Sequence, residues 1–182
     1  MNIQSDDFVL FGLARTFKQD QTQIDARRKD LQRLAHPDKF VDQGAAAQRL
    51  AMQWSVRINQ AWQRLRCPIK RAAYLCELGG AQVNADNNTL MPTDFLTQQM
   101  QWREDLDAAH SAEDHEQFRL RLNQAVHDAL QKIEYLIDVQ QAFQEAAGNV
   151  RELMFLQRLA EDACGQNVSG ELWSAAAKLA EV

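Results

Sequence analysis

The chain has 182 residues, enough for one domain or two small ones, and 46% of them are hydrophobic, so it can bury a core. Glycines and prolines are few, and the abundance of Ala, Leu, Gln, Glu and Arg favours helix. No apolar run is long enough to span a membrane. The first residues, MNIQSDDF, are acidic where a signal peptide is basic, which predicts a cytoplasmic protein.

The net charge of −5 is unevenly distributed along the chain. Residues 1–78 carry 13 Lys and Arg against 8 Asp and Glu, a net charge of +5, whereas residues 93–182 carry 7 against 16, a net charge of −9. This difference predicts two domains with different partners, of which the first binds something acidic.

The cysteines argue against a metal site or a disulfide framework. Cys67, Cys76 and Cys164 are odd in number and show no CxxC spacing. We expect free thiols in a reducing compartment.

The first half of the chain predicts four helices. The second begins with a capping pair, Asp20 and Gln23. Pro68 ends the third or opens the fourth. A helical stripe on the third is formed by Leu50, Trp54, Ile58, Ala61 and Leu65. The expected ranges are Asp6 to about Leu13, Gln21 to Ala35, Ala45 to Arg66, and Ile69 to Leu78.

The second predicted helix has two contrasting faces. Its apolar face is expected to pack against the third helix in an antiparallel hairpin. That face carries Ile24, Leu31, Leu34 and Ala35, and the basic face carries Arg27, Arg28, Lys29 and Arg33.

The segment His36-Pro37-Asp38 lies in the loop between these two helices. Proline pushes the residue before it out of the α region, so the helix ends there. His36 and Asp38 are therefore expected to project from a turn at the tip of the hairpin, where they can meet a partner.

The second half of the chain predicts a linker at 79–92 and then a bundle of three helices. The first of these runs from Thr93 or Asp94 to about Ala109. The second starts at the pair Ser111 and Asp114 and ends near Leu136. A third, capped by Asp138 and Gln141, reaches about Cys164, with a possible break at Gly148. The tail after Cys164 is expected to add an amphipathic turn through Leu172, Trp173, Ala176 and Leu179.

Residues 5–78 resemble the J-domain of co-chaperones. The likeness is carried by DDFVLFGL, the basic second helix, HPDKF and INQAWQRLRCPIKRAAYL. It implies binding to a DnaK-class chaperone ATPase and stimulation of its ATP hydrolysis. The triggering residues would be His36, Pro37 and Asp38. The docking face would be Arg27, Arg28 and Arg33.

The whole plan, a J-domain at 1–78, a linker at 79–92 and an acidic helical bundle at 93–182, resembles the HscB family of iron–sulfur assembly. NQAW, PIKRAAYL, DFLTQQMQWREDLD and VRELMFLQRL carry this likeness over about residues 5–164. It implies that the bundle delivers the scaffold protein IscU to the chaperone HscA. No cofactor is expected, because the cluster belongs to the client and the nucleotide to the chaperone.

Helical geometry gives an independent indication of the client site. Phe95, Trp102, Leu106 and Ala109 share one face of the first bundle helix, which predicts a core stripe, and Val150, Leu153, Leu156 and Ala160 do so on the last. Leu96 and Met100 lie off the first stripe, and Phe155 lies off the second, so they predict an exposed apolar patch. The resemblance assigns this patch to the scaffold partner, with Arg103 and Glu104 as its polar rim.

Other interpretations remain open at this stage. The chain could be a specialised J-domain co-chaperone with a different client, or a helical adaptor in which His36-Pro37-Asp38 is incidental. Catalysis is disfavoured because no Ser, Cys or Thr nucleophile stands beside His36 and Asp38 in the sequence. Nucleic-acid binding is disfavoured because no aromatic residues interleave with the basic helix.

Overall fold

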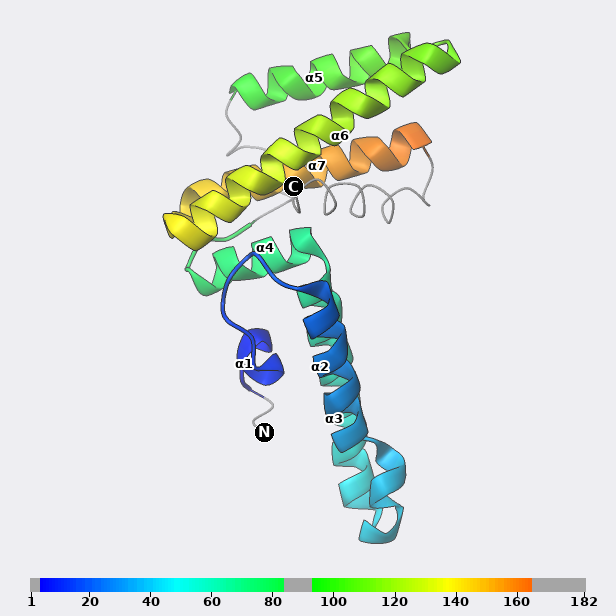
Figure 1. The fold of residues 1–182 in the computed structure, drawn as a ribbon, viewed down its shortest axis with the longest axis vertical. Helices are drawn as coiled ribbons and strands as arrows, with labels where there is room; N and C mark the ends of the chain where they lie inside the picture. Colours follow the sequence, from blue (N-terminus) through cyan, green and yellow to red (C-terminus); the bar gives the residue numbers. More distant parts are fainter. Residues whose placement is uncertain (1–3, 84–92, 165–182) are drawn as a thin grey trace. The chain divides into compact units, whose positions relative to one another are not determined.

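The computed structural model describes residues 4–83 and 93–164, and all regular structure in these ranges is helical (Figure 1). The predicted all-α class is confirmed. The chain divides into two compact units, Met1–Leu75 and Cys76–Val182. No helix in the described ranges is both long and apolar enough to cross a membrane.

The first unit is built around an antiparallel helical hairpin, as predicted (Figure 1). Its two long helices are joined by a 3₁₀ helix at the tip, and a short helix packs on their side. The elements are α1 (Asp7–Phe11), α2 (Gln21–Leu34), the 3₁₀ helix η1 (Pro37–Gln43), α3 (Ala45–Arg66) and α4 (Pro68–Leu78), of which the part from Cys76 onward belongs to the second unit.

Local capping explains where these helices begin and end. The Asp6 carboxylate accepts a hydrogen bond from the Val9 N–H at 3.0 Å, and Gly12 ends α1 at a left-handed φ of +64° that glycine adopts without strain. The helix expected to reach Leu13 is therefore shorter. Asp20 caps α2 through the Thr22 N–H at 2.8 Å, and Pro68 opens α4.

Two leucines expected inside the hairpin are exposed instead. Leu34 on α2 and Leu50 on α3 point to solvent, and the neighbouring residues Ala35 and Ala51 are buried. Adjacent positions on a helix differ by about 100° in direction, and in each of these pairs the alanine takes the buried position and the leucine the exposed one. The prediction of buried leucines here was wrong. Deeper in the hairpin, the expected positions are buried at Ile24, Leu31, Ile58, Ala61 and Leu65.

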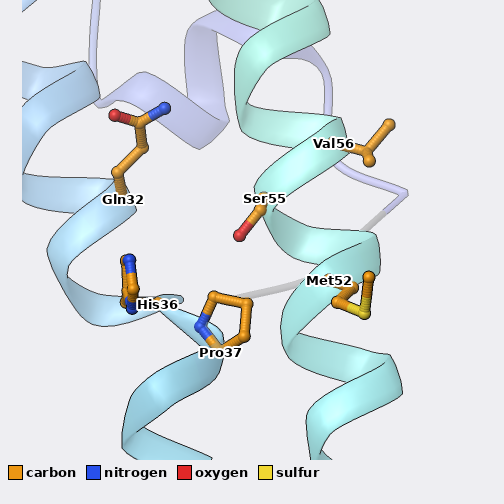
Figure 2. Close-up of a pocket in the computed structure, with 6 residues that line it drawn as sticks. All are labelled: Gln32, His36, Pro37, Met52, Ser55 and Val56. Carbon is orange, nitrogen blue, oxygen red and sulfur yellow. The ribbon is translucent and has the colours of Figure 1, made fainter.

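The hairpin tip is more regular than the predicted turn. Pro37 and Asp38 form the first residues of η1, and His36 is its N-cap residue with an extended backbone. The Ser55 hydroxyl on α3 donates a hydrogen bond to the Ala35 carbonyl at 3.2 Å. This contact ties the end of α2 to α3 at Ser55, which lies above Pro37 in the view of Figure 2.

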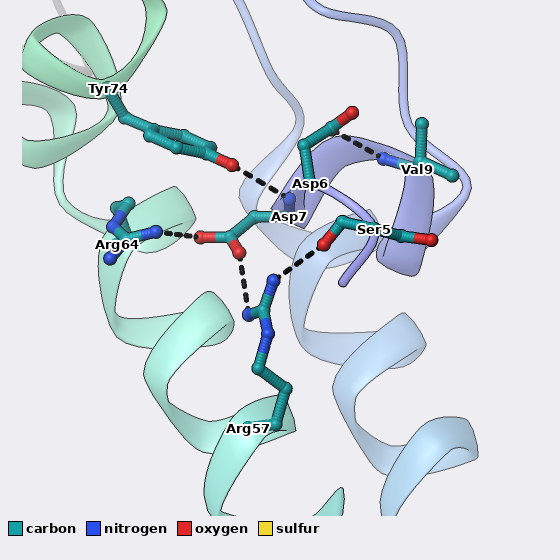
Figure 3. A network of polar contacts seen from close by, with 7 residues as sticks. All are labelled: Ser5, Asp6, Asp7, Val9, Arg57, Arg64 and Tyr74. Carbon is teal, nitrogen blue, oxygen red and sulfur yellow. Dashed lines mark hydrogen bonds and ion pairs between the residues drawn. The ribbon is translucent and has the colours of Figure 1, made fainter. Parts of the chain in front are cut away.

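A buried ion network holds α1 against the hairpin (Figure 3). The Asp7 carboxylate is fully buried, with Oδ1 2.6 Å from Arg57 Nη1 and Oδ2 2.9 Å from Arg64 Nη1. Arg57 also donates to the Ser5 carbonyl at 2.8 Å, and the Asp7 N–H donates to the Tyr74 hydroxyl at 3.1 Å. The network therefore connects α1, α3 and α4.

The second unit contains the predicted three-helix bundle. The longest pairing is between its last two helices, which a π-helical turn connects. The elements are α5 (Thr93–Ala108), α6 (Ala112–Glu134), the π-helix η3 (Tyr135–Val139) and α7 (Phe143–Cys164). Their shared core is formed by Phe118, Leu122, Val126, Ile133, Val150, Leu153, Leu156 and Ala160.

The boundaries of α6 and α7 confirm some expectations and correct others. Ser111 and Asp114 form the predicted capping box at the start of α6. Gly148 lies inside an unbroken α7. Asp138 lies in the π-helical turn and not at the start of α7, because Gln141, at a φ of +53°, separates the turn from the helix.

Two aromatic contacts connect helix α5 to the other helices of the bundle. Trp102 meets Phe118 of α6 edge to face at 5.5 Å, and Phe95 meets Phe155 of α7 in the same way at 6.0 Å. Phe95, Trp102 and Leu106 are half-buried, so the stripe predicted as core is only partly covered. The reason is that α5 packs less extensively on α6 and α7 than they pack on each other.

The domain limits of 1–78 and 93–182 stay predictions. Most of the expected linker, residues 84–92, and the tail beyond Cys164 lie outside the described residues.

Candidate functional site

The three residues singled out at the hairpin tip lie together at its surface. The side chains of His36 and Asp38 are 57% and 85% exposed. His36 Nδ1 accepts a hydrogen bond from the Asp38 N–H at 3.3 Å, and it lies 3.5 Å from Asp38 Oδ2. The hydrogen bond requires Nδ1 to be unprotonated, whereas the ion pair requires it to be protonated. The two contacts therefore cannot form at the same time. A local hydrogen bond thus holds two polar side chains toward solvent.

The structure also brings a hydroxyl near this loop. Ser55 and His36 line the same surface pocket (Figure 2), although they are distant in sequence. A nucleophile and its base need a hydrogen bond to each other. In this structure the Ser55 hydroxyl donates to the Ala35 carbonyl, and His36 Nδ1 is bonded to Asp38.

The three arginines of the predicted docking face lie in different surroundings. Arg33 is exposed and forms an ion pair with Asp30 at 3.2 Å. Arg27 is also exposed, and its guanidinium lies against Gly12, where an added Cβ would stand 3.1 Å from Nη2. Both remain accessible to an acidic partner.

Arg28 is tied to α3. Its guanidinium lies 3.7 Å from the centre of the Trp62 ring, and it donates to the Asn59 side-chain oxygen at 3.2 Å. Arg66 lies 5.0 Å from the same ring, and the Trp62 indole N–H donates to Asp25 at 2.7 Å. Trp62 is half-buried and lies close to two cations. Arg28 therefore contributes to packing of the hairpin as well as to its charge.

Sequence reasoning missed an apolar pocket beside the loop. The pocket has a volume of about 410 Å³ and is lined by Gln32, His36, Pro37, Met52, Ser55 and Val56 (Figure 2). Met52 and Val56 are 59% and 58% exposed. These two residues are one helical turn apart and off the main stripe of α3, so their spacing could have indicated a second apolar strip.

The residues of the predicted client patch lie on α5 and α7. Met100 is largely exposed and Leu96 is half-buried. Arg103 and Glu104 are exposed on the same helix, as expected of a rim. Phe155 was expected to be left uncovered, but it is half-buried because its ring meets Phe95. The aromatic pair connects the α7 part of the patch to α5, next to Leu96.

A polar contact fixes the other end of α5. The Asp105 carboxylate accepts hydrogen bonds from Arg121 of α6 and from the Gln101 amide, the latter at 3.0 Å. These two bonds, the one from Arg121 first, lower the pKa of Asp105 below its ordinary value. The Arg121 guanidinium also lies 5.1 Å from the Trp102 ring centre. This cluster connects the C-terminal part of α5 to α6.

No group of three or more potential metal ligands occurs among the described residues. Cys67 and Cys76 are free thiols, as predicted. Burial raises the pKa of the Cys76 thiol to about 11, which keeps it protonated and unreactive at neutral pH.

Comparison with known proteins agrees with this arrangement. Residues 91–163 match a family described as the HSCB C-terminal oligomerisation domain. The chain is 48% identical over 115 residues to a co-chaperone protein HscB homolog from Ralstonia nicotianae, and 44% identical over 112 residues to one from Burkholderia cenocepacia. These matches cover 63% and 62% of this chain, and 65% and 64% of the relatives. The matched segment thus spans slightly less than two thirds of each relative.

Solved structures extend the similarity to nearly the whole chain. Chaperone HscB from Vibrio cholerae is 30% identical, with a TM-score of 0.81 over 87% of this chain and 95% of that one. The human co-chaperone protein HscB, at 23% identity, shares the fold with a TM-score of 0.82 over 90% of this chain and 82% of that one. The resemblance seen in the sequence is confirmed, and the chain belongs to the HscB family of co-chaperones.

Proposed function

We propose that this chain stimulates the ATPase of a DnaK-class chaperone, HscA, and delivers the iron–sulfur scaffold protein IscU to it in the cytoplasm. The observation that carries the proposal is the exposed pair His36 and Asp38 at the hairpin tip. Asp38 can form a charge-assisted hydrogen bond with a cation of the partner. Pro37 restricts the loop, so little conformational entropy is lost on docking.

The cations of α2 support docking on an acidic surface. Arg27, Lys29 and Arg33 are exposed on the helix that leads to the tip. Charges of this kind raise the rate of encounter more than the affinity. Arg28 adds to the same positive field while it packs on Trp62.

The partly covered face of α5 supports the client part of the proposal. Leu96, Met100 and Phe155 offer apolar surface, and Arg103 and Glu104 offer charges at its border. An apolar centre with a polar rim is the ordinary anatomy of a protein interface. A scaffold protein would bind here by burying apolar surface, and the charges would set the register.

The test is steady-state ATP hydrolysis by HscA with this protein and IscU added singly and together. We expect stimulation by this protein, enhanced by IscU, and its loss on H36Q. The His36 side chain is exposed, and its one structural contact is the N-cap hydrogen bond to η1 at 3.3 Å, so H36Q should lower the unfolding free energy by at most about 1 kcal/mol. The matched control is H115Q, which changes an exposed histidine on α6 and should leave stimulation intact.

Each alternative predicts a different result. Stimulation that IscU does not enhance would indicate a co-chaperone with another client. Absence of stimulation by the unmodified chain, or equal stimulation by H36Q, would contradict the proposed role of the hairpin tip.

A further inference from the structure

We infer that Ser55 on α3 is a positioning residue for the triggering loop, His36-Pro37-Asp38, although it belongs to a different helix. Its hydroxyl holds the Ala35 carbonyl and thereby fixes the direction in which the chain leaves α2 toward His36. The inference rests on the proposed function and concerns how the loop is oriented before it meets a partner.

The residues that follow α2 offer few donors to its last carbonyls. An α-helix leaves its last four carbonyls without partners in the helix, and N–H groups just beyond its end often bind them. Pro37 has no N–H, and the Asp38 N–H donates to His36 Nδ1 at 3.3 Å. The donor for the Ala35 carbonyl comes instead from α3, where the Ser55 hydroxyl oxygen lies 3.2 Å from it.

Ser55 differs from an ordinary helical serine in its partner. A serine inside a helix commonly points to solvent or bonds to the carbonyl four residues earlier in the same helix. Ser55 is half-buried and bonds to a carbonyl that lies 20 residues earlier in the chain. Figure 2 shows the residue facing the end of α2, next to His36 and Pro37. The hydroxyl therefore connects α3 to the start of the triggering loop.

The bond at Ala35 controls the loop because few backbone torsions separate them. The Ala35 carbonyl and the His36 N–H belong to one planar peptide unit, so holding the oxygen also holds the plane from which His36 continues. Pro37 fixes its own φ and keeps His36 extended, at φ −66° and ψ 126°. A rotation of the Ala35 carbonyl would therefore be transmitted to His36 and Asp38 with little loss.

The bonds within the loop fix its shape and not its direction. His36 caps η1 through Nδ1, and its carbonyl accepts a hydrogen bond from the Lys39 N–H at 3.1 Å. Both bonds join residues of the loop to each other. The direction is set where the loop meets the hairpin, and there the buried Ala35 side chain and the Ser55 bond hold the chain together.

The experiment measures steady-state ATP hydrolysis by HscA at increasing concentrations of this protein. S55A should lower stimulation at saturation by about three- to tenfold, the range that one hydrogen bond of ordinary strength represents. The half-saturating concentration should change by less than about twofold, because the cations of α2 that govern encounter are unchanged. S55T keeps the hydroxyl and should stimulate within about twofold of the parent. Its added methyl has room, because Ser55 lines a surface pocket.

The matched control is T16V. The Thr16 hydroxyl also donates to a backbone carbonyl, that of Lys18 at 3.0 Å, in the segment between α1 and α2. T16V and S55A should lower the urea midpoint of unfolding by comparable amounts, and T16V should stimulate like the parent. A loss of stability therefore cannot by itself produce the expected difference between the two variants.

The outcomes separate this inference from the function on which it rests. If H36Q abolishes stimulation while S55A behaves like T16V, Ser55 has only a structural role and the proposed function stands. If S55T loses stimulation as S55A does, the size of the side chain matters and not its hydroxyl, which overturns the inference. A higher half-saturating concentration with full stimulation at saturation would make Ser55 a docking contact, which also overturns it. If H36Q has no effect, both the inference and the proposed function are wrong.

Discussion

The hairpin tip of the first unit and the α5 face of the second expose their candidate binding residues in different ways. At the tip, His36 and Asp38 contact each other and solvent, and the unit is held together elsewhere by its apolar core and the Asp7 network. On α5, the aromatic pair of Phe95 and Phe155 belongs both to the predicted client patch and to the packing of the bundle.

This difference determines where a mutation can change binding or activity without changing stability. Residues at the tip can be changed without loss of packing, so activity and stability respond independently there. In the bundle the Phe155 ring serves both purposes, so binding and stability are coupled there, whereas they are uncoupled at Met100, which is largely exposed.

The largest expected effect on stability lies in the frame of the first unit. D7N removes the charge that compensates Arg57 and Arg64 in a fully buried position. Breaking a buried ion pair by removing one partner costs about 3–5 kcal/mol when the charge left behind stays buried. The Arg57 and Arg64 side chains are 20% and 43% exposed, so we expect a smaller loss, about 2–3 kcal/mol, in the unfolding free energy measured by urea titration.

The control for D7N is D30N, which breaks the exposed ion pair with Arg33 and should cost at most about 1 kcal/mol. At a temperature where D7N is still folded, its stimulation of the ATPase should be nearly normal. A folded D7N that fails to stimulate would show that the hairpin tip depends on the ion network. Activity and stability would then not be independent in the first unit.

The coupling in the bundle predicts a smaller and mixed effect. F155A should weaken binding of the scaffold client and also lower the unfolding free energy by about 1–3 kcal/mol, less than for a fully buried phenylalanine, because its ring is half-buried against Phe95. M100A should weaken client binding with a stability change within about 0.5 kcal/mol. Calorimetric titration with IscU and urea unfolding measure the two quantities. Equal stability losses in both variants would contradict the coupling.

The helices of this fold could be predicted from the sequence because each has local signals. Each signal can be recognised from residues close together in the sequence. Examples are the stripes of α3 and α7, the capping box at Ser111 and Asp114, and Pro68 at the start of α4. The position of His36-Pro37-Asp38 between two amphipathic helices is equally local. Family membership followed from the same motifs.

Contacts between distant residues could not be predicted in this way. Leu34 and Leu50 fitted the apolar pattern, yet in the assembled hairpin they face solvent while the adjacent Ala35 and Ala51 are buried. The placement of Trp62 against Arg28 joins two helices. Nothing local distinguishes Asp6, a helix cap, from Asp7, a buried ion partner. Periodicity gives the face of a helix, whereas the partner of each side chain depends on the assembled fold.

The smallest expected effect concerns the carboxylate of Glu152 in the bundle. The negative charge of Asp7 is paired with two arginines, whereas that of Glu152 has only the attraction of Lys132 named with its pKa shift. Burial raises the pKa of Glu152 above its ordinary value of 4.5, and the charge of Lys132 lowers it in part. The folded state therefore holds this proton more tightly than the unfolded chain. Its stabilising contribution is complete below the unfolded pKa and is lost as the pH rises through the folded pKa.

E152Q removes this titration and should be more stable than the parent at pH 7. The gain should be less than about 1 kcal/mol, because solvent reaches the carboxylate and screens the penalty. It should disappear as the pH falls below the unfolded pKa, where the parent is protonated in both states. Urea unfolding across this pH range measures the difference, with E113Q, an exposed carboxylate on α6, as the control that shows no such gain. A loss of stability in E152Q at pH 7 would mean that the attraction to Lys132 outweighs the cost of burial, and the two units would then compensate their buried acids in the same way.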